Sequence, residues 1–140
     1  MGPQERVRAL VVDDAEMTRG ILRLMLEIEG YEVAGEAGNA REALDLVQRL
    51  VPDVVFLDIN LPDQSGMAVL QQLHHDFPDL GVIMITVDDT ADCMREAIRN
   101  GALGYVLKPL SEDRAVATIR NILRSRYGVS SRVVGLGDLY

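Results

Sequence analysis

Residues 54–66 read VVFLDINLPDQSG and carry the clearest signal of fold in the chain. Four consecutive apolar residues, Val54 to Leu57, are typical of a strand that is covered on both faces, as in the middle of a parallel sheet. The run ends on a carboxylate, Asp58, and turn formers such as Pro62 and Gly66 follow. The stretch therefore predicts a buried strand, a loop and the start of a helix.

The same unit recurs on both sides of this stretch. Strands are predicted at residues 7–12, 32–37, 54–57, 82–85 and 104–107, and helices at about residues 17–28, 40–51, 67–77, 91–100 and 111–123. This alternation predicts an α/β fold, a doubly wound five-stranded parallel sheet with helices on both faces. With the strand order 2-1-3-4-5, a common one for such sheets, the first and third strands are neighbours.

Apolar residues at helical spacing predict which face of each helix packs on the sheet. The predicted apolar faces are Met17, Ile21, Leu24, Met25 and Ile28 in the first helix and Met94, Ala97 and Ile98 in the fourth. The fifth helix is expected to begin at Ser111, before two acids that favour the positive end of the helix dipole.

Composition limits the classes of protein that fit. A chain of 140 residues suits one domain, and we expect an extension at residues 1–6, the domain at 7–126 and a tail or linker at 127–140. The net charge of −8 argues against nonspecific binding of nucleic acid by this domain. A single cysteine, no long apolar run and no hydrophobic leader favour a cytoplasmic protein without a membrane segment.

Polar residues follow the predicted strands at the points where ligands bind in sheets of this type. Asp13 and Asp14 follow the first strand, Asp58 the third, Thr86 the fourth and Lys108 the fifth. Singly, each has an ordinary explanation as a helix cap, a turn residue or a solvated loop residue. Their joint placement at one edge of the sheet favours a functional site.

Three carboxylates in one crevice repel each other unless a cation compensates. Magnesium prefers oxygen ligands and is commonly held by one or two carboxylates together with phosphate oxygens, so Mg²⁺ is the expected cofactor. Aspartate is an established nucleophile in aspartyl-phosphate chemistry. Lys108 and the Thr86 hydroxyl could then stabilise the phosphoryl oxygens.

Four motifs together resemble the receiver domains of two-component response regulators, over roughly Val7 to Leu123. They are VVDD at residues 11–14, LDINLPDQSGM at 57–67, IT at 85–86 and GYVLKP at 104–109. The resemblance implies the chemotaxis-regulator type of fold. It also implies a signalling switch that phosphorylates and dephosphorylates itself, and not an enzyme that turns over a metabolite.

The resemblance implies roles for individual residues. Asp58 would accept a phosphoryl group from a sensor histidine kinase or a histidine phosphotransfer protein. Asp13 and Asp14 would hold Mg²⁺, together with the Asp58 carboxylate and the backbone carbonyl of Asn60. Lys108 would pair with the phosphoryl group.

The resemblance also implies a cis peptide bond at Pro109, which would aim the neighbouring lysine, and a switch pair, Thr86 and Tyr105. Thr86 would move toward the phosphoryl group and the Tyr105 ring would turn into the vacated space. The surface of the fourth helix, fifth strand and fifth helix would then change and control a downstream protein or effector domain.

Three positions are expected to tune the lifetime of the phosphoryl group. By the resemblance, Asn60 and Asp88 border the path of the attacking water. Val87 departs from the family pattern, which usually has alanine, glycine or serine there. We expect its larger side chain to narrow the pocket and to slow phosphorylation or dephosphorylation relative to a Val87→Ala variant.

Other classes fit less well. A phosphatase of the haloacid dehalogenase type needs a second acid two residues after the nucleophile, where this chain has Asn60. A flavodoxin needs a Ser/Thr-rich phosphate loop after the first strand. A receiver-like module that binds proteins independently of phosphorylation remains the alternative, and a homodimer through the fourth and fifth helices is also compatible with the sequence.

Overall fold

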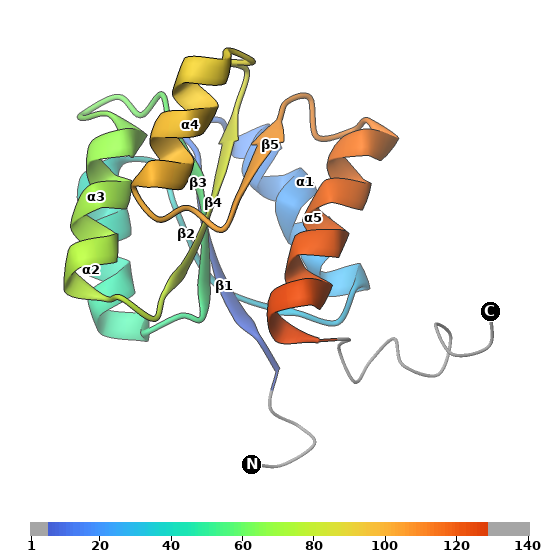
Figure 1. Cartoon of the computed structure of the whole chain (residues 1–140). Helices are drawn as coiled ribbons and strands as arrows, with labels where there is room; N and C mark the ends of the chain where they lie inside the picture. Colours follow the sequence, from blue (N-terminus) through green and yellow to red (C-terminus); the bar gives the residue numbers. More distant parts are fainter. Residues whose placement is uncertain (1–5, 129–140) are drawn as a thin grey trace.

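A computed structural model describes residues 6–128 and shows a sheet with helices on both faces (Figure 1). The strands are β1 Arg8–Val12, β2 Glu32–Ala37, β3 Val54–Asp58, β4 Gly81–Thr86 and β5 Gly104–Leu107. The helices are α1 Glu16–Ile28, α2 Ala40–Leu50, α3 Gly66–Asp76, α4 Ala91–Arg99 and α5 Asp113–Tyr127. Within the described range, no helix is long and apolar enough to cross a membrane.

The sheet has the strand order β2-β1-β3-β4-β5 and its paired strands are parallel, which confirms the predicted fold class. β3 lies in the middle, and all five of its residues are buried. The consecutive apolar residues at its start reflect that position, because both faces of a central parallel strand are covered. The carboxyl ends of β1 and β3 therefore lie side by side.

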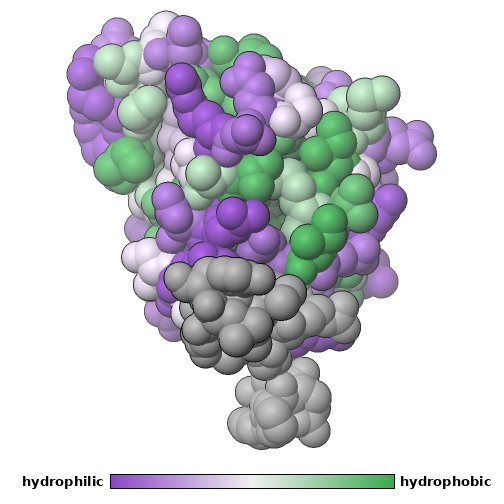
Figure 2. Space-filling view, turned by 90° about the vertical axis from the view of Figure 1, so that its right-hand side faces the viewer, coloured by the Kyte–Doolittle hydropathy of each residue, from purple (hydrophilic) through white to green (hydrophobic). Residues whose placement is uncertain are grey.

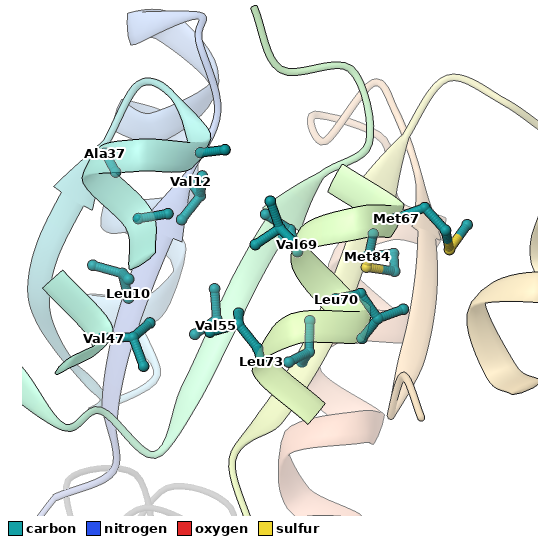
Figure 3. Packing of buried hydrophobic residues seen from close by; sticks show 14 of the residues in the cluster. Leu10, Val12, Ala37, Val47, Val55, Met67, Val69, Leu70, Leu73 and Met84 are labelled. Atoms are coloured by element: carbon teal, nitrogen blue, oxygen red, sulfur yellow. The ribbon is translucent and has the colours of Figure 1, made fainter. Parts of the chain in front are cut away.

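Alternate residues of the strands build a separate core on each face of the sheet. Leu10 and Val55 point toward α2 and α3, where they pack with residues such as Val47 and Leu73 (Figure 3). Their strand neighbours, such as Phe56, point to the opposite face, which α1 and α5 cover. The two layers hold the sheet in place from both sides.

The predicted buried face of α1 is partly wrong. Leu22 and Leu26 are the residues that are fully buried, whereas Met17 is 79%, Leu24 60% and Ile28 64% exposed. Two apolar series, displaced by one position, run along this helix, and both have helical spacing. Only the packing of α1 on the sheet selects one of them.

The predictions for Met94 and Ile98 in α4 are also wrong, since these side chains are 40% and 53% exposed. Ala97 alone is fully buried in this helix. α4 lies near the short edge strand β5 (Figure 1), so only a narrow strip of its surface reaches the core.

The limits of α5 differ from the sequence-based expectation at both ends. The helix begins at Asp113, because Ser111 lies in a turn, and it continues to Tyr127. The Tyr127 hydroxyl donates a hydrogen bond of 3.0 Å to the carbonyl of Asp53, which ties the end of the helix to the sheet. The expected extension, except residue 6, and the tail beyond Gly128 lie outside the described residues.

Candidate functional site

Three carboxylates lie together at the carboxyl ends of β1 and β3. One oxygen from each of Asp13, Asp14 and Asp58 lies within 4.8 Å of the others. Asp13 and Asp58 are 1% and 3% exposed, whereas Asp14 is exposed. The cluster is therefore buried on one side and open to solvent on the other.

Lys108 supplies a positive charge to this cluster from the end of β5. Its Nζ lies 2.7 Å from Oδ2 of Asp13 and donates a hydrogen bond of 3.2 Å to Oδ2 of Asp58. Its backbone N–H donates to the carbonyl of Thr86, so β4 positions the lysine backbone. The peptide bond between Lys108 and Pro109 is cis.

Burial and neighbouring charges perturb the titration of the site. Burial raises the pKa of Asp58, and the nearby Asp13 adds to that effect, although bonds from the Asn60 backbone and Lys108 act in the other direction. Burial alone would lower the pKa of Lys108, but Asp13 and Asp58 outweigh it, and the pKa is raised. The lysine therefore stays charged beside two acids.

The donor set fits a hard divalent cation. Oδ2 of Asp13 is buried and accepts no hydrogen bond within residues 6–128, because Lys108 Nζ lies at ion-pair distance without hydrogen-bonding geometry. This oxygen thus has an ion-pair partner in Lys108 and keeps a lone pair for a further ligand. Oxygen ligands from three acids, open to water on one side, are the kind of set that Mg²⁺ takes.

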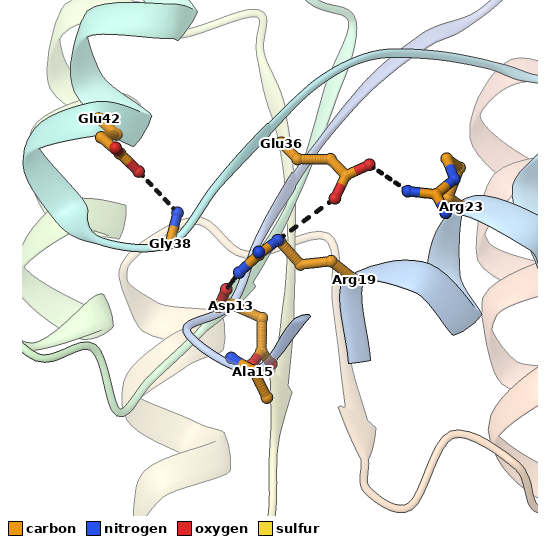
Figure 4. A network of polar contacts seen from close by, with 7 residues as sticks. All are labelled: Asp13, Ala15, Arg19, Arg23, Glu36, Gly38 and Glu42. Carbon is orange, nitrogen blue, oxygen red and sulfur yellow. Dashed lines mark hydrogen bonds and ion pairs between the residues drawn. The ribbon is translucent and has the colours of Figure 1, made fainter. Parts of the chain in front are cut away.

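Sequence reasoning missed the group that holds the backbone of Asp13. Arg19 donates from Nη1 to the Asp13 carbonyl at 2.5 Å and from Nε to Glu36 of β2 at 3.2 Å (Figure 4). Glu36 also accepts from Arg23, on the exposed side of the network. An arginine six residues after Asp13 was the available signal, but its partner in β2 becomes visible only in the folded chain.

Gly66 was also missed as a site residue. A Cβ at this position would lie 2.0 Å from the Asp58 carbonyl oxygen and 2.7 Å from Cα of Ile59. The Gly66 N–H donates to the Ile59 carbonyl, and the Asn60 N–H donates 3.1 Å to Oδ1 of Asp58. The loop after β3 thus folds back tightly over the backbone of Asp58.

The two residues of the expected switch pair bond to the same stretch of backbone. The buried Thr86 hydroxyl accepts a hydrogen bond of 3.1 Å from the N–H of Asp88. The Tyr105 hydroxyl donates 2.7 Å to the carbonyl of Asp88. Val87, between Thr86 and Asp88 in the sequence, is 68% exposed. Its side chain lines a hollow of about 370 Å³ that Lys108 also lines.

Comparison with known proteins agrees with this geometry. A family profile described as "Response regulator receiver domain" matches residues 9–120. The chain is 34% identical over 115 residues to the chemotaxis protein CheY of Thermotoga maritima, covering 82% of this chain and 96% of that protein. It is 31% identical over 128 residues to the response regulator GacA of Pseudomonas aeruginosa, covering 91% of this chain and 60% of GacA.

Among solved structures, a CheY-like response regulator receiver domain protein of Methanospirillum hungatei is similar, with a TM-score of 0.77 and 29% identity, over 87% of this chain and 97% of that one. The transcriptional regulatory protein MctR of Rhizobium johnstonii is 31% identical over 123 residues, 87% of this chain. The chain spans only 58% of the length of MctR.

Proposed function

Because this chain belongs to the family of response regulator receiver domains, we propose that it is a phosphoryl-accepting signalling switch with Asp58 as the acceptor. The observation that carries this proposal is the buried Asp58 carboxylate, which lies beside Asp13 and accepts a hydrogen bond from Lys108 at 3.2 Å. A buried acid held next to a cation and two further acids fits phosphoryl transfer better than it fits a purely structural role.

The proposed reaction is a transfer from phosphohistidine on a sensor histidine kinase or a histidine phosphotransfer protein. An oxygen of Asp58 attacks the phosphorus and forms a P–O bond, while the P–N bond breaks and its electron pair stays on the imidazole nitrogen. Lys108 is placed to offset the charge on the phosphoryl oxygens, and the hydroxyl of Thr86 can donate to one of them. Water later hydrolyses the acyl phosphate, which resets the switch.

Asp13, Asp14 and Asp58, with the backbone carbonyl of Asn60, would hold Mg²⁺. The ion supplies positive charge that brings the dianionic phosphoryl group and the acids together. The chain contributes the fixed position of Asp13, whose backbone bonds to Ala37 and Arg19 on either side. These bonds keep the carboxylate oriented before any ligand arrives.

The signal would leave the site through the backbone of Asp88. When Thr86 turns its hydroxyl to the phosphoryl group, it gives up the bond from the Asp88 N–H, and the bond from Tyr105 to the Asp88 carbonyl loses its fixed acceptor. Tyr105 can then turn inward, and the surface of α4, β5 and α5 changes. We propose that Asn60, Asp88 and Val87 tune the rates of phosphorylation and dephosphorylation. The Val87→Ala variant should be faster in at least one of these two steps.

This surface would act on a downstream protein or effector domain in the cytoplasm, with a homodimer as one arrangement. Relatives such as MctR are named transcriptional regulatory proteins, and the chain matches only part of their length. With a net charge of −8, this domain is proposed to act through protein contacts and not by binding nucleic acid itself. In that role it needs no turnover of a metabolite.

Intact mass spectrometry after incubation with acetyl phosphate and Mg²⁺ tests the proposal. We expect one phosphoryl adduct on the native chain, and no adduct on Asp58→Asn or when Mg²⁺ is chelated. An adduct on Asp58→Asn would contradict the assignment of the acceptor. No adduct on the native chain, with Mg²⁺ bound and a matched kinase also inactive, would favour the binding module that works independently of phosphorylation.

A further inference from the structure

α1 carries a stripe of exposed apolar side chains. Met17, Leu24 and Ile28 are 79%, 60% and 64% exposed, and their spacing places them on one side of the helix. Figure 2 views the face formed by α1 and α5 and shows hydrophobic surface gathered in a run there. A contiguous exposed apolar patch commonly marks a contact surface.

The end of the stripe at Ile28 lies beside a groove between α1 and α5. The groove has a volume of about 150 Å³ and is lined by apolar side chains that include Met25, Ile28 and Val116. Glu29 and Arg120, which form an ion pair at 3.0 Å, also line it. A cavity of this size accepts one aliphatic or aromatic side chain.

The other end of the stripe, at Met17, lies near the proposed phosphorylation site. At the start of α1, Met17 and Ile21 line the open hollow of about 370 Å³ that also contains Val87, Lys108 and Pro109. One continuous apolar path therefore leads from the α1–α5 groove to the rim of the site.

A segment of this chain starts at the groove end of the path. α5 ends at Tyr127, and the carbonyl of the next residue, Gly128, accepts a hydrogen bond of 3.4 Å from the hydroxyl of Tyr31, three residues after α1. Residues 129–140, VSSRVVGLGDLY, follow directly. They lie outside the described residues.

The length and composition of this segment match the path. Twelve residues reach at most about 40 Å, whereas the 13 residues of α1 span about 20 Å. Half of the segment is apolar, namely Val129, Val133, Val134, Leu136, Leu139 and Tyr140. Its one arginine and one aspartate leave it without net charge, which suits an apolar surface.

We propose that residues 129–140 dock on the exposed stripe of α1, with an apolar side chain of the segment seated in the α1–α5 groove. The segment is attached to the surface that it covers, so its effective concentration there is high and a small apolar contact suffices.

Amide NMR spectra of the full chain, without Mg²⁺ or phosphodonor, test the docking. A variant with both Val133→Ser and Leu136→Ser should shift the amides of residues 17–28 and leave those of α3 unchanged. Conversely, Leu24→Ser should shift the amides of residues 129–140. Ile98→Ser changes an aliphatic residue of α4 that is 53% exposed and is the matched control. It should leave the amides of residues 129–140 unshifted.

Hydrogen exchange gives a second measure on the same proteins. Amides of α1 should exchange about tenfold faster in the segment variant, roughly the effect of uncovering one leucine side chain. Spectra in which the segment variant leaves α1 unchanged would overturn the proposal. Amide shifts of α1 in the native chain that change on dilution would show that a second copy covers the stripe. That result would also overturn the proposal.

Discussion

Lys108 is one ammonium group shared by two buried carboxylates, Asp13 and Asp58, with Asp14 at the rim. The acids outnumber the base, so the site keeps a net negative charge that burial makes unfavourable. Oδ2 of Asp13, which has Lys108 as an ion-pair partner at 2.7 Å but accepts no hydrogen bond within the described residues, belongs to the same imbalance. At this scale the acidic cluster is one that a cation would stabilise, because a single lysine faces three acids.

The raised pKa of Asp58 has a consequence for stability. An acid whose folded-state pKa lies above its unfolded value destabilises the fold, and this penalty grows as pH rises from the unfolded pKa through the folded one. Asp58→Asn removes the charge, so in metal-free buffer it should raise the melting temperature at pH 7 by a few degrees. Its advantage should shrink as the pH is lowered toward the unfolded-state pKa of 3.8. A melting temperature at or below that of the native chain at pH 7 would contradict this.

Arg19 should affect magnesium through the backbone that it holds. Arg19→Met removes the bond to the Asp13 carbonyl, and we expect the dissociation constant for Mg²⁺, measured by calorimetry, to rise roughly tenfold. Arg23→Met is the matched control, because Arg23 pairs with the same Glu36 on the exposed side. Equal weakening by both substitutions, or by neither, would rule out a positioning role for Arg19.

Among the elements, the loop between β3 and α3 connects the site to the rest of the fold. Asp63 accepts hydrogen bonds from the N–H groups of Ala40 and Arg41, at the start of α2, and these bonds lower its pKa. Ser65 caps α3 through the N–H of Met67. One loop thus fixes the start of two helices while it folds over the backbone of Asp58.

The close approach of Gly66 to Asp58 predicts a large penalty for any side chain. A Cβ at position 66 would lie 2.0 Å from a backbone oxygen that has little freedom to move, so Gly66→Ala should lower the free energy of unfolding by about 3 kcal/mol. Gly20→Ala, inside α1, where a Cβ would meet Arg23 Nη2 at 3.9 Å as its nearest contact outside the local backbone, should raise it by up to about 1 kcal/mol. Urea unfolding measures both, and a neutral Gly66→Ala would contradict the contact.

Over the whole molecule, negative charge dominates, with 22 acids against 14 bases, and three of the acids converge at one edge of the sheet. Asp13 and Asp14 directly follow β1 and Asp58 ends β3, and the pairing of these two strands holds the three acids in register. Ligand binding at that edge therefore stabilises the fold as a unit.

Magnesium should raise the melting temperature of the whole domain. At a concentration of about 100 times its dissociation constant, a ligand adds roughly 2.7 kcal/mol to the stability of the folded state. Thermal unfolding with and without Mg²⁺ should thus differ by several degrees in the native chain. Asp14→Asn, at the exposed member of the cluster, should keep the fold and lose most of this difference; a full response in this variant would exclude Asp14 as a ligand.

Much of the fold could be predicted from the sequence, because its signals are local. Consecutive apolar residues from Val54 mark a central strand, and polar residues such as Asp58 and Lys108 stand where strands end. In a parallel sheet the carboxyl ends of the strands share one edge, so these positions alone predicted that the side chains would meet.

The tertiary structure decided what local spacing leaves ambiguous. Both apolar series of α1 fit a helix, and only its packing on the sheet buries Leu22 and exposes Leu24. The contacts of Arg19 and Gly66 with the backbone of the acids likewise depend on how separate elements approach each other. Periodicity fixes which residues share a face, whereas the choice between faces is made by the free energy of packing the whole domain.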